Sequence, residues 1–238
     1  MSLPAVFCGI DIESFDRVKK LYGRGAMPLG LFTDSENRWI RSYLSAAYAF
    51  TAKEAILKAF GSGWFNTEID AHEIELGFDA HGIPRLVNFT GEAKRRCGYD
   101  ESLLSLDFYR LGGGLLSVFT LLGSQCDPMQ TRIIALCRSS HQLHNLSTGE
   151  IIPAHAVWGG ECANTRVLGH RVIQFAVQSL CRGSDALDEL GCVGYDESGA
   201  PQWINSSKLD GGMFNVAGIS ITHDRNYICG IVIGKYLH

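Results

Sequence analysis

The chain carries one turn motif twice, at corresponding places in its two halves. Phe78-Asp79-Ala80-His81-Gly82-Ile83-Pro84 in the first half is echoed by Tyr195-Asp196-Glu197-Ser198-Gly199-Ala200-Pro201 in the second. The pattern of apolar segments also restarts after a polar, turn-forming stretch at residues 123–128. A repeat of this length indicates duplication of a whole domain, because solenoid repeats have much shorter periods. We therefore predict two tandem units, residues 1–124 and residues 130–238.

Hydrophobic periodicity predicts the same α+β unit in both halves, a helix layer on an antiparallel sheet. In the first half we expect strands at residues 6–12, 71–78, 85–89, 103–109 and 115–122, and helices at 14–21, 33–42 and 46–60. In the second half we expect a strand at 133–137, a helix at 167–180, and strands at 217–222 and 227–233. Thr33 and Glu36 have the spacing of a capping box, and Gly61 is placed to end the long helix.

Composition excludes several classes of protein. Of the 238 residues, 46% are hydrophobic and 19% charged, which is typical of a folded chain with a substantial core. The net charge of −4 argues against a nucleic-acid partner. The one dense basic run, Lys94-Arg95-Arg96, is better explained as a solvated helix face.

The cysteines and the apolar stretches point to the cytoplasm. Eight cysteines are scattered from Cys8 to Cys229 without a Cys-x-x-Cys pair, which favours reduced thiols in the core. The N-terminal residues lack the cationic and apolar pattern of a secretory leader. No apolar stretch approaches the roughly twenty residues that a membrane span needs. We expect a cytoplasmic protein without a membrane segment.

An acidic cluster in the first half is the strongest candidate site. Phe50, Glu54 and Lys58 share one stripe of the long predicted helix, where the Glu–Lys pair could also be an ordinary exposed ion pair. Asp11 lies on an otherwise apolar strand, and a buried carboxylate needs a cation or a position near solvent. If Asp11, Glu13 and Glu54 converge, their oxygens suit Mg²⁺, which keeps waters and phosphate oxygens in its shell. Such carboxylates with lysines nearby predict a site for a metal-bound diphosphate.

A histidine in the second half is a second candidate. His223 lies at the end of a predicted strand among Ser220, Thr222, Asp224 and Arg225. Imidazole, hydroxyl and guanidinium groups could hold a phosphate there. A hydrogen-bonded structural histidine is the alternative, and the residues alone do not separate the two.

Each half lacks the chemical groups that the other retains. Laying the two long helices together places Gln174 opposite Glu54 and Gln178 opposite Lys58. Laying the terminal hairpins together places Gly112 opposite His223. We therefore predict one composite active site to which both halves contribute.

Several motifs together resemble one known family. They are Gly9-Ile10-Asp11-Ile12-Glu13, Phe32-Thr33-Asp34-Ser35-Glu36, Phe50-Thr51-Ala52-Lys53-Glu54-Ala55-Ile56-Leu57-Lys58-Ala59-Phe60-Gly61-Ser62-Gly63, and Ile219-Ser220-Ile221-Thr222-His223-Asp224. Their order and spacing are similar to those of the 4'-phosphopantetheinyl transferase superfamily, which includes the holo-acyl-carrier-protein synthases. The resemblance covers most of the first half, but in the second half only the turn motif and about the last twenty residues.

The resemblance implies transfer of phosphopantetheine from coenzyme A to a serine of an acyl or peptidyl carrier protein, in fatty acid, polyketide or peptide synthesis. Asp11 and Glu54 would hold Mg²⁺, with Glu13 as a candidate third ligand. Glu54, or a metal-bound water beside it, would take the serine proton. Arg17 would dock the acidic carrier, although a solvated helix arginine is an equal alternative. The residues implied to contact coenzyme A are Lys53, Lys58, Gly61, Ser62, Gly63, Ser220, Thr222 and His223.

The resemblance also implies a monomer with internal pseudo-twofold symmetry. Duplicated members of the family usually carry the histidine motif in their first half and the acid motif in their second, and this chain reverses that order. Two other functions stay open on the sequence alone. One is a non-catalytic carrier-docking module of the same fold, and the other is a different Mg²⁺-dependent diphosphate enzyme, such as a nucleotide hydrolase.

Overall fold

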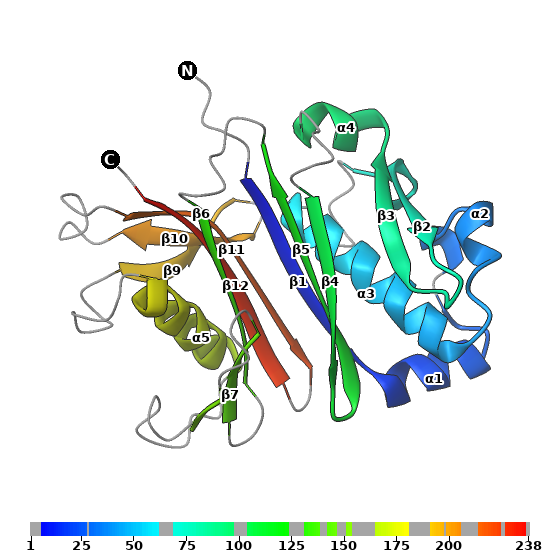
Figure 1. The fold of residues 1–238 in the computed structure, drawn as a ribbon, viewed down its shortest axis with the longest axis horizontal. Helices are drawn as coiled ribbons and strands as arrows, with labels where there is room; N and C mark the ends of the chain where they lie inside the picture. The colour runs from blue at the N-terminus through cyan, green and yellow to red at the C-terminus, as the bar shows by residue number, and fades with distance from the viewer. Residues whose placement is uncertain are drawn as a thin grey trace. The chain divides into compact units, whose positions relative to one another are not determined.

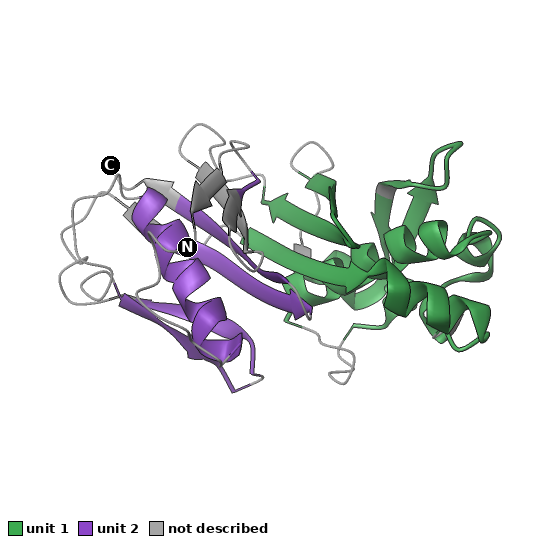
Figure 2. Cartoon of the chain, turned by 90° about the horizontal axis from the view of Figure 1, so that it is seen from below, with its two compact units in different colours: residues 1–124 green, residues 125–238 purple. Residues whose placement is uncertain are grey.

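A computed structural model describes most of the chain. The described residues are 6–27, 29–61, 69–97, 104–123, 131–138, 142–146, 151–153, 165–180, 191–197, 199–205, 214–224 and 227–236. The chain divides into two compact units, residues 1–124 and residues 125–238 (Figure 2).

The first unit combines a three-stranded antiparallel sheet, a two-stranded hairpin and several helices (Figure 1). The sheet has the order β1-β5-β4, and β2 pairs with β3 in the hairpin. The strands are β1 (Val6–Ser14), β2 (Ile74–Phe78), β3 (Pro84–Phe89), β4 (Leu104–Leu111) and β5 (Gly114–Leu122). The helices are α1 (Phe15–Gly23), α2 (Asp34–Asn37), α3 (Tyr43–Ala59) and α4 (Gly91–Cys97), with 3-10 turns η1 (Leu29–Leu31) and η2 (Ala71–Glu73).

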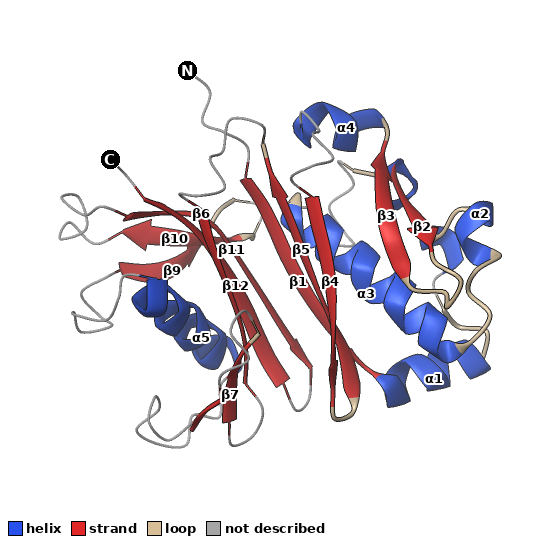
Figure 3. Ribbon diagram, in the orientation of Figure 1, coloured by secondary structure: helices blue, strands red, loops and turns tan. Residues whose placement is uncertain are grey.

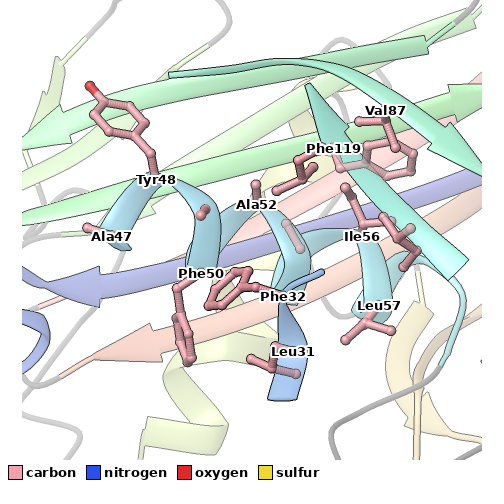
Figure 4. Close-up of a cluster of buried hydrophobic side chains, with 14 of the residues drawn as sticks. Leu31, Phe32, Ala47, Tyr48, Phe50, Ala52, Ile56, Leu57, Val87 and Phe119 are labelled. Atoms are coloured by element: carbon pink, nitrogen blue, oxygen red, sulfur yellow. The ribbon is translucent and has the colours of Figure 1, made fainter. Parts of the chain in front are cut away.

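Helix α3 is the centre of this unit. It runs between the sheet and the β2–β3 hairpin, and α1 packs beside it (Figures 1 and 3). Every residue from 45 to 57 is therefore buried, including Lys53 and Glu54. Ile56, Leu57, Val87 and Phe119 contribute to the apolar core around it (Figure 4). A helix buried on all sides is expected to be apolar all round, so its charged residues need a specific explanation.

Side-chain caps set the helix boundaries. Ser14 caps α1 as predicted, and its Oγ accepts a hydrogen bond from the Arg17 N–H at 3.3 Å. The Thr33–Glu36 capping box is also present. However, the helix it starts ends at Asn37 rather than near residue 42, because the Ser42 hydroxyl caps α3 instead. Helix α3 consequently begins three residues earlier than predicted.

The second unit has a five-stranded sheet, a hairpin and one long helix. Its sheet has the order β11-β12-β6-β7-β8, and β9 pairs with β10. The strands are β6 (Thr131–Arg138), β7 (Gln142–Asn145), β8 (Ile151–Pro153), β9 (Gly191–Tyr195), β10 (Pro201–Asn205), β11 (Phe214–Asp224) and β12 (Tyr227–Tyr236). Helix α5 (Thr165–Leu180) packs on this sheet through Val172, Ile173, Ala176 and Val177.

The two units share one topology, which confirms the predicted duplication. In the first unit β1 pairs with β5, and β5 pairs with β4. In the second unit β6 pairs with β12, and β12 pairs with β11 in the same way. The repeated turn motif also has the same bonds in both. Asp79 Oδ1 accepts from the Ile83 N–H at 3.0 Å, and Asp196 Oδ1 accepts from the Ala200 N–H at 2.9 Å. Gly82 and Gly199 both adopt a positive φ, which glycine favours.

The hairpin register corrects one predicted correspondence between the halves. In the first unit the pair nearest the β4–β5 turn is Leu111 with Gly114, and in the second it is Asp224 with Tyr227. Matching these closing pairs places Arg110, and not Gly112, at the position of His223. The gapped sequence alignment missed this because it matched glycines instead of the turn.

Two further predictions concern the surface and the membrane. Arg95 and Arg96 on α4 pair with Glu92, and the Arg95 side chain is 76% exposed, which confirms a solvated helix face. None of the helices in the described ranges has the length and apolarity that a membrane crossing requires.

Candidate active site in the first unit

Gly9 lets α3 cross β1 at unusually short range. A Cβ atom on Gly9 would lie 1.8 Å from the carbonyl oxygen of Ala55 and 2.7 Å from the amide nitrogen of Ala59. No larger residue fits there, because both atoms belong to the backbone of α3. The contact brings the second half of α3 directly against β1.

Gly9, Asp11 and Glu13 face α3 together, because side chains alternate along a strand. Ser117, the β5 partner of Asp11, confirms the face by donating a hydrogen bond to Thr51 Oγ1 on α3 at 2.6 Å. Asp11 is 5% exposed. Its Oδ1 lies 2.5 Å from Lys58 Nζ. The predicted buried carboxylate therefore has a cation, and the predicted stripe of α3 faces the acid motif.

Glu54 is the buried carboxyl group of the cluster on α3. It is 3% exposed, and within the described residues its Oε1 receives no hydrogen bond. Burial and the nearby Asp11 carboxylate raise the pKa of Glu54 to about 8. At neutral pH this carboxyl holds its proton unless a further positive charge approaches.

Lys58 is the positive member of the cluster. Burial works against its ammonium, but the carboxylates of Asp11, Glu54 and Glu13 outweigh burial and raise its pKa. Its side chain is still 30% exposed, so Lys58 lies between the buried carboxylates and the surface of the unit. It is placed to contact a charged group that enters the site.

Arg17 on α1 pairs with Glu13, which lies four residues earlier on β1. The two side chains form an ion pair in which Glu13 is 8% and Arg17 59% exposed. Arg17 thus has a largely exposed side chain while it helps to neutralise the acid motif.

The donor set suits a magnesium ion with two protein ligands. In the described ranges no three His, Cys, Asp or Glu side chains form a group able to hold a metal. The predicted trio of Asp11, Glu13 and Glu54 is therefore not assembled as such, because Lys58 and Arg17 pair with Asp11 and Glu13. Mg²⁺ in phosphate sites commonly takes only one or two carboxylates. The Asp11 carboxylate helps to raise the pKa of Glu54, and within the described residues Glu54 Oε1 receives no hydrogen bond. Both observations fit a pair of carboxylate ligands.

Comparisons with known proteins identify the family of the chain. Residues 7–110 match the 4'-phosphopantetheinyl transferase superfamily. The holo-[acyl-carrier-protein] synthase of Aliarcobacter butzleri is 32% identical over 100 residues, which cover 41% of this chain and 83% of that protein.

The chain belongs to the 4'-phosphopantetheinyl transferase superfamily.

The predicted class of enzyme, a transferase of this superfamily, is thereby confirmed. Similar solved structures include the Helicobacter pylori holo-[acyl-carrier-protein] synthase in complex with coenzyme A, at 24% identity and a TM-score of 0.41, covering 49% of this chain and 99% of that one. The holo-ACP-synthase of Plasmodium yoelii has 21% identity and a TM-score of 0.39, covering 52% of this chain and 100% of that one.

The assignment of Lys53 to coenzyme A is wrong. Its side chain is 0% exposed and pairs with the equally buried Glu36, with 2.9 Å between Nζ and Oε2. Nζ also donates to the carbonyl oxygens of Ala71 at 2.7 Å and Ile74 at 2.5 Å. An ammonium has three donors, and these three contacts use all of them. Burial lowers the pKa of Lys53, and Glu36 opposes that shift.

The glycine-rich end of α3 is only partly described. Gly61 has φ +70° and its N–H donates to the Lys58 carbonyl, which confirms that glycine ends this helix. Ser62 and Gly63, the other two residues predicted to contact coenzyme A there, lie outside the described residues.

The histidine motif of the second unit is divided between two faces of β11. Ser220 and Thr222 are 4% and 5% exposed, whereas His223 is exposed. Successive side chains on a strand point to opposite faces, so the two hydroxyls lie on the face opposite to His223. The prediction that Ser220, Thr222 and His223 contact one phosphate together is therefore wrong. Of the three side chains, only that of His223 is exposed.

Three structural residues of the site escaped sequence reasoning. Gly9 was read only as part of a motif, although a glycine on a buried strand facing a helix is itself a sign of close backbone approach. Ser117 and Glu36 act through partners 66 and 40 residues away, Thr51 and Leu76. No periodicity in a single sequence connects such pairs.

Proposed function

We propose that this enzyme transfers the 4'-phosphopantetheine group of coenzyme A to a serine hydroxyl of an apo acyl or peptidyl carrier protein. Adenosine 3',5'-bisphosphate would be released. The observation that carries this proposal is the buried cluster of Asp11, Glu54 and Lys58 in a chain of this superfamily. The A. butzleri relative, a holo-[acyl-carrier-protein] synthase, supports the same substrate class.

We propose that Asp11 and Glu54 hold a Mg²⁺ ion when coenzyme A is bound. The ion would supply positive charge to the diphosphate, which stabilises the charge of the leaving bisphosphate. Glu54, whose pKa of about 8 otherwise keeps it protonated at neutral pH, would be ionised as a ligand of that ion.

The side chains then have distinct roles in the transfer. The serine oxygen forms a bond to the phosphorus that carries pantetheine, and the bond from that phosphorus to the bridging oxygen breaks. Glu54 accepts the serine proton, and the electron pair of the broken bond leaves with the bisphosphate. Lys58, whose side chain is partly exposed, neutralises charge on the phosphates.

We propose that His223 contacts the phosphates of coenzyme A and that one chain supplies the whole site, as a cytoplasmic monomer. Arg17 is proposed to bind an acidic side chain of the carrier, since its side chain is 59% exposed. Lys53 has no part in this proposal, because all three contacts of its ammonium are made within the first unit. Ser220 and Thr222 have none, because they lie on the face of β11 opposite to His223.

The test is mass spectrometry of several apo carrier proteins after incubation with the enzyme, coenzyme A and Mg²⁺. The expected result is a mass increase equal to one phosphopantetheine group on at least one carrier, which disappears when Mg²⁺ is chelated. Binding of coenzyme A without transfer would indicate a docking module instead. Release of adenosine bisphosphate without any carrier would indicate a hydrolase.

A further inference from the structure

A fully buried ion pair lies on the side of α3 that faces away from the acid motif. Glu36 and Lys53 have side chains that are 0% exposed. Glu36 Oε1 accepts from the Leu76 N–H at 2.7 Å, and its Oε2 accepts from the Thr33 N–H at 2.8 Å. With the bonds of Lys53 to Ala71 and Ile74, the pair joins α2, η2 and β2 to the middle of α3.

Stability alone does not account for such a pair. Taking two charges out of water costs several kcal/mol per ion, and apolar replacements of buried ion pairs are often neutral or stabilising. The second unit provides the comparison within the same chain. Its α5 contains no lysine and no acidic residue, and Val193 and Trp203 of its hairpin join the apolar core around α5. Arg166 of α5 does lie over the ring of Tyr195 in the hairpin, at 4.4 Å, but Tyr195 is exposed. The same helix-to-hairpin contact is therefore made there without a buried ion pair.

The position of the pair suggests what it contributes. Lys53 directly precedes Glu54, so any rotation of α3 that displaces one displaces the other. On the sheet side, Gly9 and the Thr51–Ser117 hydrogen bond fix how close α3 approaches and where along its axis. A buried pair with five specific bonds admits one arrangement, whereas apolar packing tolerates sliding and rotation.

We propose that Lys53 and Glu36 form a positioning clamp for phosphopantetheine transfer. The clamp fixes the rotation of α3 about its own axis and so holds Glu54 and Lys58 against Asp11. This inference rests on the proposed function. A displacement of about 1 Å in a catalytic group can reduce the rate about 10²-fold, so a device of this kind has a measurable effect.

The experiment compares Lys53→Met, the double variant Glu36→Gln/Lys53→Met, and the matched control Lys94→Met, an exposed lysine on α4. The single variant leaves Glu36 buried without its cation and should lower the midpoint of urea unfolding. The double variant removes both charges and should recover most of that stability. Transfer rates are then measured at saturating and limiting coenzyme A.

A positioning role predicts a specific pattern of kinetic constants. The double variant should have a kcat at least about tenfold below that of the wild type, with a KM for coenzyme A within about threefold, since Lys58 and Asp11 are unchanged. Lys94→Met should match the wild type in both constants. A folded double variant with the kcat of the wild type would contradict the positioning role. A double variant in which only the KM for coenzyme A rises would contradict it as well.

Two other outcomes have separate meanings. A double variant that does not fold would overturn the proposal, because the pair would then be needed for packing itself. A wild-type enzyme that modifies no carrier would overturn the proposed function, and the clamp with it.

Discussion

Helices α3 and α5 occupy equivalent places in their units, yet their buried surfaces differ. Around α3 lie Asp11, Glu54 and Lys58, whereas α5 has neither a lysine nor an acidic residue and packs through apolar side chains. In the part of the second unit that the structure describes, the buried polar side chains are Asn145, Ser220 and Thr222, none of which is charged. Because a buried carboxylate lowers stability, its retention in the first unit indicates a function and not a structural need.

The largest effect is expected from removing the charge of Glu54. Glu54→Gln should lower kcat/KM for transfer about 10³-fold, because both the proposed base and a metal ligand are lost. Gln174→Ala on α5, at the residue aligned with Glu54 by sequence, should change it less than twofold. The measurement is the initial rate of carrier modification by mass spectrometry. Comparable losses in both variants would remove the functional contrast between the helices.

The same residue should make the stability of the metal-free protein depend on pH. Folding raises the pKa of Glu54 from 4.5 to about 8, so between these values the folded state binds more protons than the unfolded state. Stability therefore falls as pH rises through this range. Relative to Glu54→Gln, the wild type should lose about 3 kcal/mol between pH 5 and pH 8.

Urea unfolding of both proteins in a chelating buffer measures this difference. Mg²⁺ should stabilise the wild type more at pH 8 than at pH 5, because it favours the ionised carboxylate, and should have little effect on Glu54→Gln. Parallel pH curves for the two proteins would contradict the shifted pKa.

Much of the fold follows from local sequence, but the site depends on distant contacts. The strand of the acid motif, the caps at Ser14 and Thr33 and the duplicated turn were predicted because each rests on residues within one element. The role of Lys53 was not predicted. Its position in the helix is equally compatible with an exposed lysine and with a buried lysine that pairs with Glu36. The opposite faces of Ser220 and His223 were open to prediction from strand alternation, and the motif resemblance obscured them.

A pair of glycines sharpens the comparison between the two helix contacts. A Cβ on Gly9 meets backbone atoms of α3, whereas a Cβ on Gly230 meets the side chains of Ile173 and Val172, at 2.8 and 3.1 Å. Side-chain ends can move and a helix backbone cannot move alone. Gly9→Ala should therefore cost about 2 to 3 kcal/mol and most of the transfer activity, against less than about 1 kcal/mol for Gly230→Ala.

Thermal and urea unfolding with parallel rate measurements test both glycine variants. Equal destabilisation by the two substitutions would mean that the close approach of α3 to β1 is less rigid than the distances indicate.

The equivalent hairpin positions of His223 and Arg110 allow a third comparison. His223→Ala should lower kcat/KM for coenzyme A about tenfold, through loss of a proposed phosphate contact. Arg110→Ala should change it less than twofold, since the Arg110 Nε–H donates to the Tyr48 hydroxyl at 3.1 Å within the first unit. Isothermal titration with coenzyme A would separate binding from turnover. A greater loss at Arg110 would reverse the assignment of roles between the hairpins.

The smallest effect is expected at Arg17. Arg17→Ala should raise KM for the carrier about threefold at low salt and leave kcat unchanged, because an exposed ion pair contributes about 1 kcal/mol or less. Arg171→Ala, an exposed arginine of α5, serves as the control and should leave KM unchanged. The difference between the two should vanish as ionic strength rises and screens the pairing. A KM that is insensitive to both variants at low salt would leave Arg17 with its pairing to Glu13 alone, and carrier recognition would have to rest on other residues.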